Sequence, residues 1–195
     1  MLKLYLAGPE VFLEDATEMG RLKVELCARY GFEGLYPLDG EPVMAGTDGQ
    51  GMSARIFGAN LALIRRADVV LANLTPFRGV SADPGTAFEL GFGFALGKKV
   101  AAYSNLPGDL LSRAREHIGA AGHEDAAPTL MADGLHAEDF GLFDNLMLAE
   151  ALIACDLPVM QAETPPADSF RDLLLFEATL QALADAEGST MSRAG

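Results

Sequence analysis

The stretch ADVVLANLTPFRGVSADPGTAFELG, residues 67–91, decides the fold class because it contains a complete strand, a loop and the start of a helix. Residues 68–74 form a mainly apolar run, which is typical of a strand buried on both faces of a parallel sheet. Asp83 then provides an N-capping carboxylate, and Pro84 provides a proline at the first helical position. These signals predict a central strand followed by a helix over 84–96.

The segments on both sides of this stretch repeat the alternation of short apolar runs with helical periodicity. Strands are predicted at 2–6, 32–36, 68–74 and 100–104. Helices are predicted at 16–30, 53–66, 84–96, 142–153 and 170–187, with Ser53 as the cap of the second and a linker at 158–166 before the last. This βαβ alternation predicts a parallel α/β sheet with helices on both faces and right-handed crossovers.

The length and composition suit one folded domain, since the chain has 195 residues and 50% of them are hydrophobic. We predict a single domain over 1–195, with its core in 1–155 and a C-terminal linker and helix in 156–195. A formal net charge of −14 disfavours binding to nucleic acid or to an anionic membrane. The chain has no apolar run near the ~20 residues that span a bilayer and no signal-peptide pattern, so we expect a cytoplasmic protein. Cys27 and Cys155 have no CxxC spacing, which favours free thiols.

Ligands of open α/β sheets bind beyond the carboxyl ends of the strands, which directs attention to loops 7–12, 37–52 and 74–83. The glycine-rich part of the second loop, 38–52, is predicted to form a lid or wall of the site. Polar side chains in and near these loops are Tyr5, Glu10, Asn73, Thr75, Arg78, Asp83, Thr86 and Glu89. The Gly8-Pro9-Glu10 turn places a carboxylate where a dinucleotide phosphate would lie, so phosphate binding there is disfavoured.

Glu89 is the main candidate for a chemical role. It lies between Phe88 and Leu90 in a stretch whose only other charge before Lys98 belongs to Asp83, and a solvent-exposed helix face does not have this composition. The alternatives are an ordinary exposed glutamate and, for Asp83, a purely capping role. Two carboxylates beside one pocket permit glycosyl chemistry, with one carboxylate as nucleophile and the other as proton donor.

Metal-dependent and serine-dependent chemistry receive little support from the sequence. His117, His123 and His136 lack the spacing of a zinc site, so no metal is expected. Ser53 and Ser81 lack the GxSxG context of a nucleophilic serine.

Four segments resemble the nucleoside 2-deoxyribosyltransferase family: YLAGPEVF at 5–12, ADVVLANLTPFRG at 67–79, DPGTAFELG at 83–91 and DNLM at 144–147. The resemblance implies a flavodoxin-like three-layer sandwich with a mainly parallel sheet of about five strands and C-terminal helices. It also implies transfer of a 2-deoxyribosyl group between nucleobases by double displacement, with hydrolysis as a side reaction. The substrates would be a deoxynucleoside and a free nucleobase, and no cofactor would be needed.

The resemblance also assigns roles to individual residues. Glu89 would be the nucleophile that forms a deoxyribosyl ester, Asp83 would exchange protons with the base, and Tyr5 would hold the nucleophile. Asn145 and Met147 would reach into a neighbouring subunit's pocket, which implies a homo-oligomer, a dimer or an assembly of dimers. Because residues two apart on a helix point ~200° apart, one of them must act through its backbone or the segment must be irregular. The full predicted substrate-binding set is Gly8, Glu10, Asn60, Asn73, Arg78, Thr86, Asn145 and Met147.

One position departs from the pattern of some members of the family. Asn60 stands where those members have an aspartate that touches the base, and an amide keeps its donor and acceptor at every pH whereas a carboxylate does not. Two alternatives remain open at this point. One is an N-glycosidase of the same superfamily, with nucleosides favoured over nucleotides, and the other is a nucleoside-binding module without catalysis.

Overall fold

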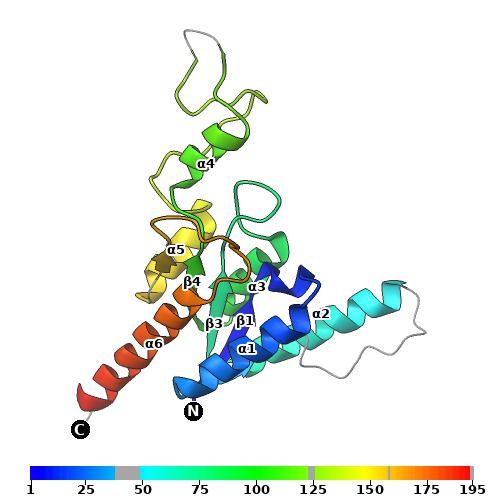
Figure 1. Ribbon diagram of the computed structural model, residues 1–195, viewed down its shortest axis with the longest axis vertical. Helices are drawn as coiled ribbons and strands as arrows, with labels where there is room; N and C mark the ends of the chain where they lie inside the picture. The colour runs from blue at the N-terminus through cyan, green and yellow to red at the C-terminus, as the bar shows by residue number, and fades with distance from the viewer. Residues whose placement is uncertain (38–48, 123–125, 158, 194–195) are drawn as a thin grey trace.

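The computed structural model describes residues 1–37, 49–122, 126–157 and 159–193. Within these residues one sheet forms with the strand order β2-β1-β3-β4-β5, and every neighbouring pair is parallel. The strands are β1 (Lys3–Ala7), β2 (Glu33–Leu35), β3 (Val69–Asn73), β4 (Lys99–Ser104) and β5 (Val159–Gln161). This is the flavodoxin-like order, so the predicted fold class is confirmed (Figure 1).

Helices cover both faces of the sheet and form the outer two of three layers (Figure 1). One face carries α1 (Ala16–Arg29) and α6 (Leu174–Arg193), and the other carries α2 (Gly49–Arg66), α3 (Pro84–Ala95) and α5 (Leu146–Cys155). Successive side chains of β3 point to opposite faces, so Leu71 joins the core with Phe176 of α6, while Val70 joins the core with Leu90 of α3. A short 3-10 helix, η1 (Pro9–Phe12), follows β1.

The parallel sheet brings the candidate loops to one edge, because the strands β1, β3 and β4 all end there. The register places Ala7 beside Ala72 and Asn73 beside Tyr103. Helix α3 packs closely on the face of the sheet because Gly93 has no side chain: a Cβ there would stand 2.5 Å from Cγ2 of Val70. The close approach of α3 puts its first turns beside the end of β1.

The arm formed by residues 106–122 and 126–145 projects beyond this edge of the sheet and contains α4 (Leu110–His117), as Figure 1 shows. Its base is tied to the loop before α3. The side chain of Arg113 donates hydrogen bonds to the carbonyl oxygens of Val80 and Phe143, and the carboxylate of Asp144 accepts one from the backbone N–H of Ala82 at 3.0 Å. The segment that follows the arm is therefore fixed relative to Asp83.

Several predicted boundaries are wrong. The helix predicted to follow Ser53 begins at Gly49, so 49–52 is helical, while 38–48 of the predicted loop lie outside the described residues. Each glycine costs a helix only about 1 kcal/mol relative to alanine, so the glycines at 49 and 51 do not prevent the helix from extending to Gly49. The predicted helix 142–153 begins only at Leu146, since the side chain of Asn145 caps it. The predicted helix 170–187 begins at Leu174.

The C-terminal part contributes more to the core than predicted. The predicted linker 158–166 contains β5, which pairs with Ala102–Ser104 of β4. Phe176 and Leu180 of α6 are fully buried against the sheet. The hydrophobic core therefore extends beyond residue 155.

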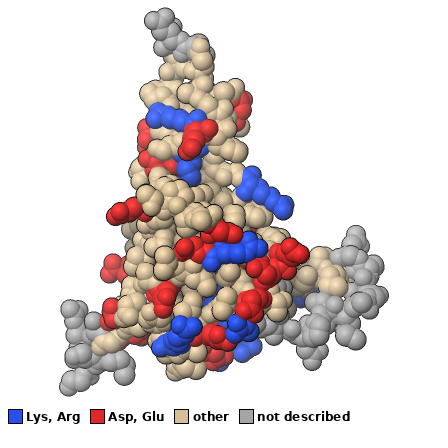
Figure 2. Space-filling view, in the orientation of Figure 1, with Lys and Arg blue, Asp and Glu red and all other residues tan. Residues whose placement is uncertain are grey.

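The surface carries charges of both signs. Figure 2 shows acidic and basic side chains interspersed over the lower part of one face. Arg171 pairs with Asp15 and Asp168, and Arg21 pairs with Glu18 and Glu25. None of the helices among the described residues combines the length and the apolar character that crossing a bilayer requires.

Candidate active site

A cavity of about 310 Å³ lies at the carboxyl edge of the sheet. Its walls come from the loop after β1, the end of β2, helix α2 and the first turns of α3. The residues that line it are Gly8, Val11, Phe12, Pro37, Ile56, Asn60, Asp83, Gly85, Thr86 and Glu89. A second cavity, of about 420 Å³, opens between α2 and α3 and shares Asn60 and Glu89 with the first. The carboxylate of Glu89 is thus accessible from two hollows of the protein.

Glu89 is half-buried, and its contacts come from two other elements. The hydroxyl of Tyr5 on β1 donates a hydrogen bond to Oε1 of Glu89 at 2.6 Å, and Nδ2 of Asn60 on α2 donates to the same oxygen at 3.2 Å. Burial raises the pKa of Glu89 to about 7; the two hydrogen bonds act against this rise, and the charge of Asp83 adds to it. Burial and the nearby Glu89 also hold the pKa of Tyr5 far above its usual value. Both forms of the Glu89 carboxyl are therefore accessible near neutral pH.

Asp83 caps α3, as predicted. Its Oδ2 accepts hydrogen bonds from the backbone N–H of Thr86 at 2.8 Å and from the Thr86 hydroxyl at 3.1 Å. The carboxylate is buried at the positive end of the helix and still lines the cavity that Glu89 lines. The capping role and a chemical role are compatible here, because both carboxylates face one space.

Two of the predicted substrate-binding residues belong to a buried cluster outside the lining of the cavity. Oε1 of Glu10 accepts hydrogen bonds from Nζ of Lys23 at 2.7 Å, from Nδ2 of Asn73 at 3.0 Å and from the hydroxyl of Tyr103 at 2.9 Å. Oδ1 of Asn73 accepts a further bond from the backbone N–H of Thr75. The structure places Glu10 and Asn73 beneath the loop that forms the wall of the cavity.

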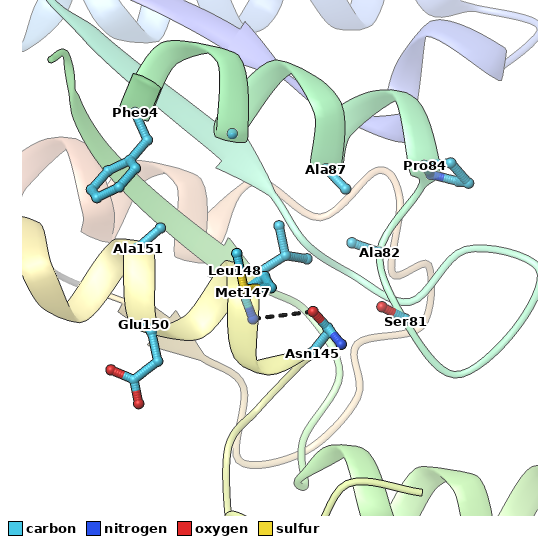
Figure 3. Close-up of a pocket in the computed structure, with 11 residues that line it drawn as sticks. Ser81, Ala82, Pro84, Ala87, Phe94, Asn145, Met147, Leu148, Glu150 and Ala151 are labelled. Carbon is cyan, nitrogen blue, oxygen red and sulfur yellow. Dashed lines mark hydrogen bonds between the residues drawn. The ribbon is translucent and has the colours of Figure 1, made fainter. Parts of the chain in front are cut away.

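The two residues predicted to serve a neighbouring subunit lie away from the Glu89 cavity of their own chain. Asn145 precedes α5, and its Oδ1 accepts a hydrogen bond from the backbone N–H of Met147, so the segment is irregular as one alternative required. The side chain of Met147 is 72% exposed. Both residues line a groove between α3 and α5, in which Phe94 and Leu148 approach from opposite sides (Figure 3).

Arg78 also lies outside the lining of the Glu89 cavity. Its guanidinium stands 4.9 Å from the ring centre of Phe77, and its backbone has a φ of 53°, in the left-handed region. The structure therefore separates Arg78, Glu10 and Asn73 from the cavity, whereas Gly8, Asn60 and Thr86 line it.

A family model described as nucleoside 2-deoxyribosyltransferase matches residues 4–147, which include every candidate site residue. The chain belongs to this family. Membership supports a deoxyribosyltransferase or a related N-glycosidase activity.

Three proteins similar to this nucleoside 2-deoxyribosyltransferase family protein each cover more than 80% of its length. An uncharacterised protein of Schizosaccharomyces pombe is 31% identical over 182 residues, which cover 82% of this chain and 83% of that protein. The structure of a 2-desoxiribosyltransferase from Leishmania mexicana has 30% sequence identity and a TM-score of 0.61, with 95% of this chain and 98% of that chain covered. A conserved protein from Enterococcus faecalis V583, 16% identical with a TM-score of 0.54 over 93% of this chain and 98% of that chain, shares the fold.

Sequence reasoning missed five residues that line the cavity, Val11, Phe12, Pro37, Ile56 and Gly85, none of which carries a charged or polar side chain as a signal. It also missed a charged residue of the region beneath the cavity, the lysine that pairs with Glu10. Lys23 lies four residues after Met19 and three before Leu26, so it occupies the buried stripe of α1. A lysine within an apolar stripe signals a buried partner, although the stripe does not reveal which carboxylate is that partner.

The histidines give no sign of a metal centre within the described ranges. Nδ1 of His136 is hydrogen-bonded to the hydroxyl of Thr129 at 2.8 Å, and His123 lies outside the described residues. No group of three candidate ligands gathers in the part of the chain that the structure describes.

Proposed function

We propose that this protein transfers a 2-deoxyribosyl group between nucleobases by double displacement, with Glu89 as the nucleophile. The observation that carries the proposal is the hydrogen bond from Tyr5 to Glu89 inside a cavity that Asp83 also lines. Both hydrogen bonds found for this carboxylate among the described residues fall on Oε1. We therefore assign Oε2 to the attack on the sugar.

In the first half of the reaction, Oε2 of Glu89 attacks the anomeric carbon of a bound nucleoside. The C1′–N bond breaks, Asp83 delivers a proton to the departing base, and the sugar remains as an ester of Glu89. In the second half, a new base attacks the same carbon, its proton passes to Asp83, and Glu89 leaves as a carboxylate. Two inversions restore the original configuration. The attack needs an ionised Glu89, and a pKa of about 7 supplies that form at neutral pH.

The cavity favours nucleosides over nucleotides. The described residues that line it include two carboxylates, Asp83 and Glu89, and no lysine or arginine, so a 5′-phosphate would meet repulsion. Nδ2 of Asn60 donates its hydrogen bond to Glu89, whereas the buried Oδ1 of the same amide has no hydrogen-bond partner among the described residues. We expect Asn60 to bind bases through an N–H donor of the base. Gly8 and Thr86 would complete the wall around the substrate.

We further propose that the site is completed by a second copy of this chain. Asn145 and Met147 line the groove between α3 and α5 and not the Glu89 cavity of their own chain, so we assign them to the substrate of a neighbouring subunit. Helix α3 also exposes two aromatic side chains, Phe88 on its side towards α2 and Phe94 in the groove towards α5, and such exposed apolar groups are typical of a helix that packs against another chain. Figure 3 shows Met147 at the groove.

We place the reaction in the cytoplasm. Both cysteines of the chain, Cys27 and Cys155, are free thiols, which suits a reducing compartment. Burial raises the pKa of the Cys27 thiol to about 12, so this thiol stays protonated and has no part in the chemistry.

The decisive experiment incubates the protein with 2′-deoxyinosine and adenine, and separately with thymidine and cytosine, followed by chromatography. A new nucleoside establishes transfer, whereas free deoxyribose alone establishes an N-glycosidase and overturns the transfer proposal. Intact-mass measurement of acid-quenched protein should show a deoxyribosyl adduct, absent from Glu89→Ala. Glu116→Ala, which removes an exposed carboxylate on α4, is the matched control and should retain both the adduct and the activity.

Mixing two inactive variants tests the shared site. Neither Glu89→Ala nor Asn145→Ala should be active alone. In a hybrid dimer, the Asn145→Ala chain keeps its own nucleophile and receives Asn145 from the other chain, so a 1:1 mixture should regain about one quarter of native activity. A mixture that regains nothing, although the chains exchange, would show that each chain builds its site alone.

A further inference from the structure

The ion pair between Lys23 and Glu10 is fully buried. Nζ of Lys23 lies 2.7 Å from Oε1 of Glu10, and each side chain is 1% exposed. The ammonium group also stands 4.7 Å from the ring centre of Phe176. An apolar pair of similar volume would stabilise the fold at least as well, because both charges lose their hydration here. Stability alone therefore does not account for the pair.

Glu10 belongs to the segment that forms one wall of the Glu89 cavity. It lies in η1, and the next two residues, Val11 and Phe12, line the cavity. Gly8 stands at the N-cap of this short helix and has no side chain that could cap it. The side chain of Glu10 is bonded instead to Lys23, Asn73 and Tyr103, at 2.7, 3.0 and 2.9 Å, and so anchors the wall to the sheet and to α1.

The backbone before η1 rests directly on this carboxylate. A Cβ on Gly8 would stand 1.9 Å from Oε2 of Glu10 and 3.0 Å from Cβ of Asn73. Gly8 also lines the cavity, so any shift of the Glu10 carboxylate moves the cavity lining with it. The ring of Phe12 also stacks on the ring of Phe77, with 5.2 Å between their centres, and Phe77 meets Phe170 edge-on, with 6.1 Å between centres. The wall is therefore held by the ion pair and by these three aromatic rings.

We propose that the Lys23–Glu10 pair is a positioning device that decides whether the deoxyribosyl ester on Glu89 is captured by a nucleobase or by water. The inference rests on the proposed function and assigns no contact with substrate to either residue. The ester has two fates. When a base attacks C1′, a C1′–N bond forms, the ester C1′–O bond breaks, and the proton of the base passes to Asp83. When water attacks, a C1′–O bond to water forms, the same ester bond breaks, and the proton of water passes to Asp83.

Both fates use Glu89 and Asp83 equally, but only capture by a base uses the wall formed by Val11 and Phe12. A loosened wall binds the base less well and admits more water, while the ester still forms and still breaks. The pair should therefore control the ratio of new nucleoside to free deoxyribose.

The test measures this ratio for the native protein and for Lys23→Met, with 2′-deoxyinosine as donor and adenine as acceptor. Both products come from the same ester, so the ratio does not depend on the fraction of protein that is folded. We expect the ratio to fall about tenfold, since small displacements of a binding wall have effects of this size. The half-saturating concentration of adenine should rise about tenfold, and the maximal transfer rate should change less than about threefold. An unchanged ratio in folded Lys23→Met would overturn the proposal.

Two further variants keep the test conclusive. The double variant Lys23→Met/Glu10→Gln leaves no lone buried charge, so it replaces Lys23→Met if that single variant does not fold. In the double variant the ratio of new nucleoside to free deoxyribose should fall about threefold or more. Lys98→Met is the matched control, because Nζ of the half-buried Lys98 donates to the carbonyl oxygens of Arg65 and Ala67, away from the cavity. A fall in the ratio for Lys98→Met equal to that for Lys23→Met would overturn the proposal, since general destabilisation would then suffice.

Equilibrium binding of radiolabelled adenine and cytosine separates this inference from the proposed function. If the native protein forms no new nucleoside, the transfer proposal fails, but Lys23→Met should still bind the bases about tenfold more weakly than the native protein. Equal affinity in the native protein and Lys23→Met overturns the positioning role. A native protein that neither turns over nor binds a base overturns both proposals.

Discussion

Two glutamates, the buried Glu10 and the half-buried Glu89, stand at the same edge of the sheet in different surroundings. Oε1 of Glu10 receives the ammonium of Lys23 together with two neutral donors. Oε1 of Glu89 receives two neutral donors, from Tyr5 and Asn60. The side chain of Glu10 is almost fully buried, whereas Glu89 faces two cavities.

The difference between them is the cation, because hydrogen-bond donors are plentiful at both. A full positive charge at 2.7 Å compensates the charge of Glu10 and fixes its position. Glu89 has no such partner among the described residues, so burial acts on its charge and raises its pKa to about 7. A carboxylate without a cation keeps its electron pairs available for bond formation. One glutamate is therefore suited to holding a loop, and the other to attacking a carbon.

The largest expected effect comes from removing the charge of Glu10. Glu10→Gln leaves the ammonium of Lys23 buried without an anion, and the free energy of unfolding should fall by about 3–5 kcal/mol. Urea unfolding at pH 7 measures this loss. A fall of less than about 1 kcal/mol would mean that the ion pair contributes no more than an exposed one does.

The glutamate-to-glutamine substitution at Glu89 should have the opposite effect on the free energy of unfolding. The pKa of Glu89 is raised from 4.5 to about 7 in the folded protein, so the folded state holds the proton more tightly than the unfolded state between these values. The stability gained from protonated Glu89 is fully present below about pH 4.5 and is lost as pH rises to about 7. Glu89→Gln keeps that stability at all pH values, and at pH 8 it should be more stable than the native protein by about 1–3 kcal/mol. The native and variant proteins should differ little at pH 4, and a difference independent of pH would contradict the assignment.

Only one side of the contrast between the two glutamates could be predicted from the sequence. Glu89 could be found because its signal is local: it stands among apolar residues one turn after the cap at Asp83. The environment of Glu10 is not local, because its partners lie 13, 63 and 93 residues away. The Gly8-Pro9-Glu10 turn correctly marked the region, but sequence could not tell a residue under the wall from a residue in the cavity.

The same difference between local and non-local signals applies to the elements of the fold. The strand at Val69–Asn73 and the cap at Asp83 were predictable, because composition and capping chemistry specify them within a few residues. Strand β5 has only three residues, and the prolines on both sides of it favoured a linker; it forms because the edge of β4 offers backbone partners to it. The start of α5 was predicted too early because apolar residues of the arm extend the helical pattern past the cap at Asn145.

A substitution of Asn60 should raise the pKa of Glu89 further. Asn60→Asp replaces a donor to Glu89 with a like charge, and both changes raise the pKa of Glu89. The acidic limb of kcat/KM should shift to higher pH by about one unit. Asn60→Ala removes the donor alone and should shift the limb by less. If the two variants give the same limb as the native protein, Asn60 has no influence on the nucleophile.

The smallest expected effect compares one substitution at both carboxylates. Tyr5→Phe removes the 2.6 Å hydrogen bond that lowers the pKa of Glu89, so the acidic limb of kcat/KM should move up by about half a unit, the equivalent of one hydrogen bond. Tyr103→Phe removes a comparable bond, at 2.9 Å, from Glu10. For Tyr103→Phe, the acidic limb of kcat/KM should stay at the same pH as in the native protein, because Lys23 still compensates the charge of Glu10 and Glu10 takes no part in the reaction. Equal shifts in both variants would show that the pH dependence reports the stability of the fold, and the distinction between an anchoring and a reactive glutamate would be lost.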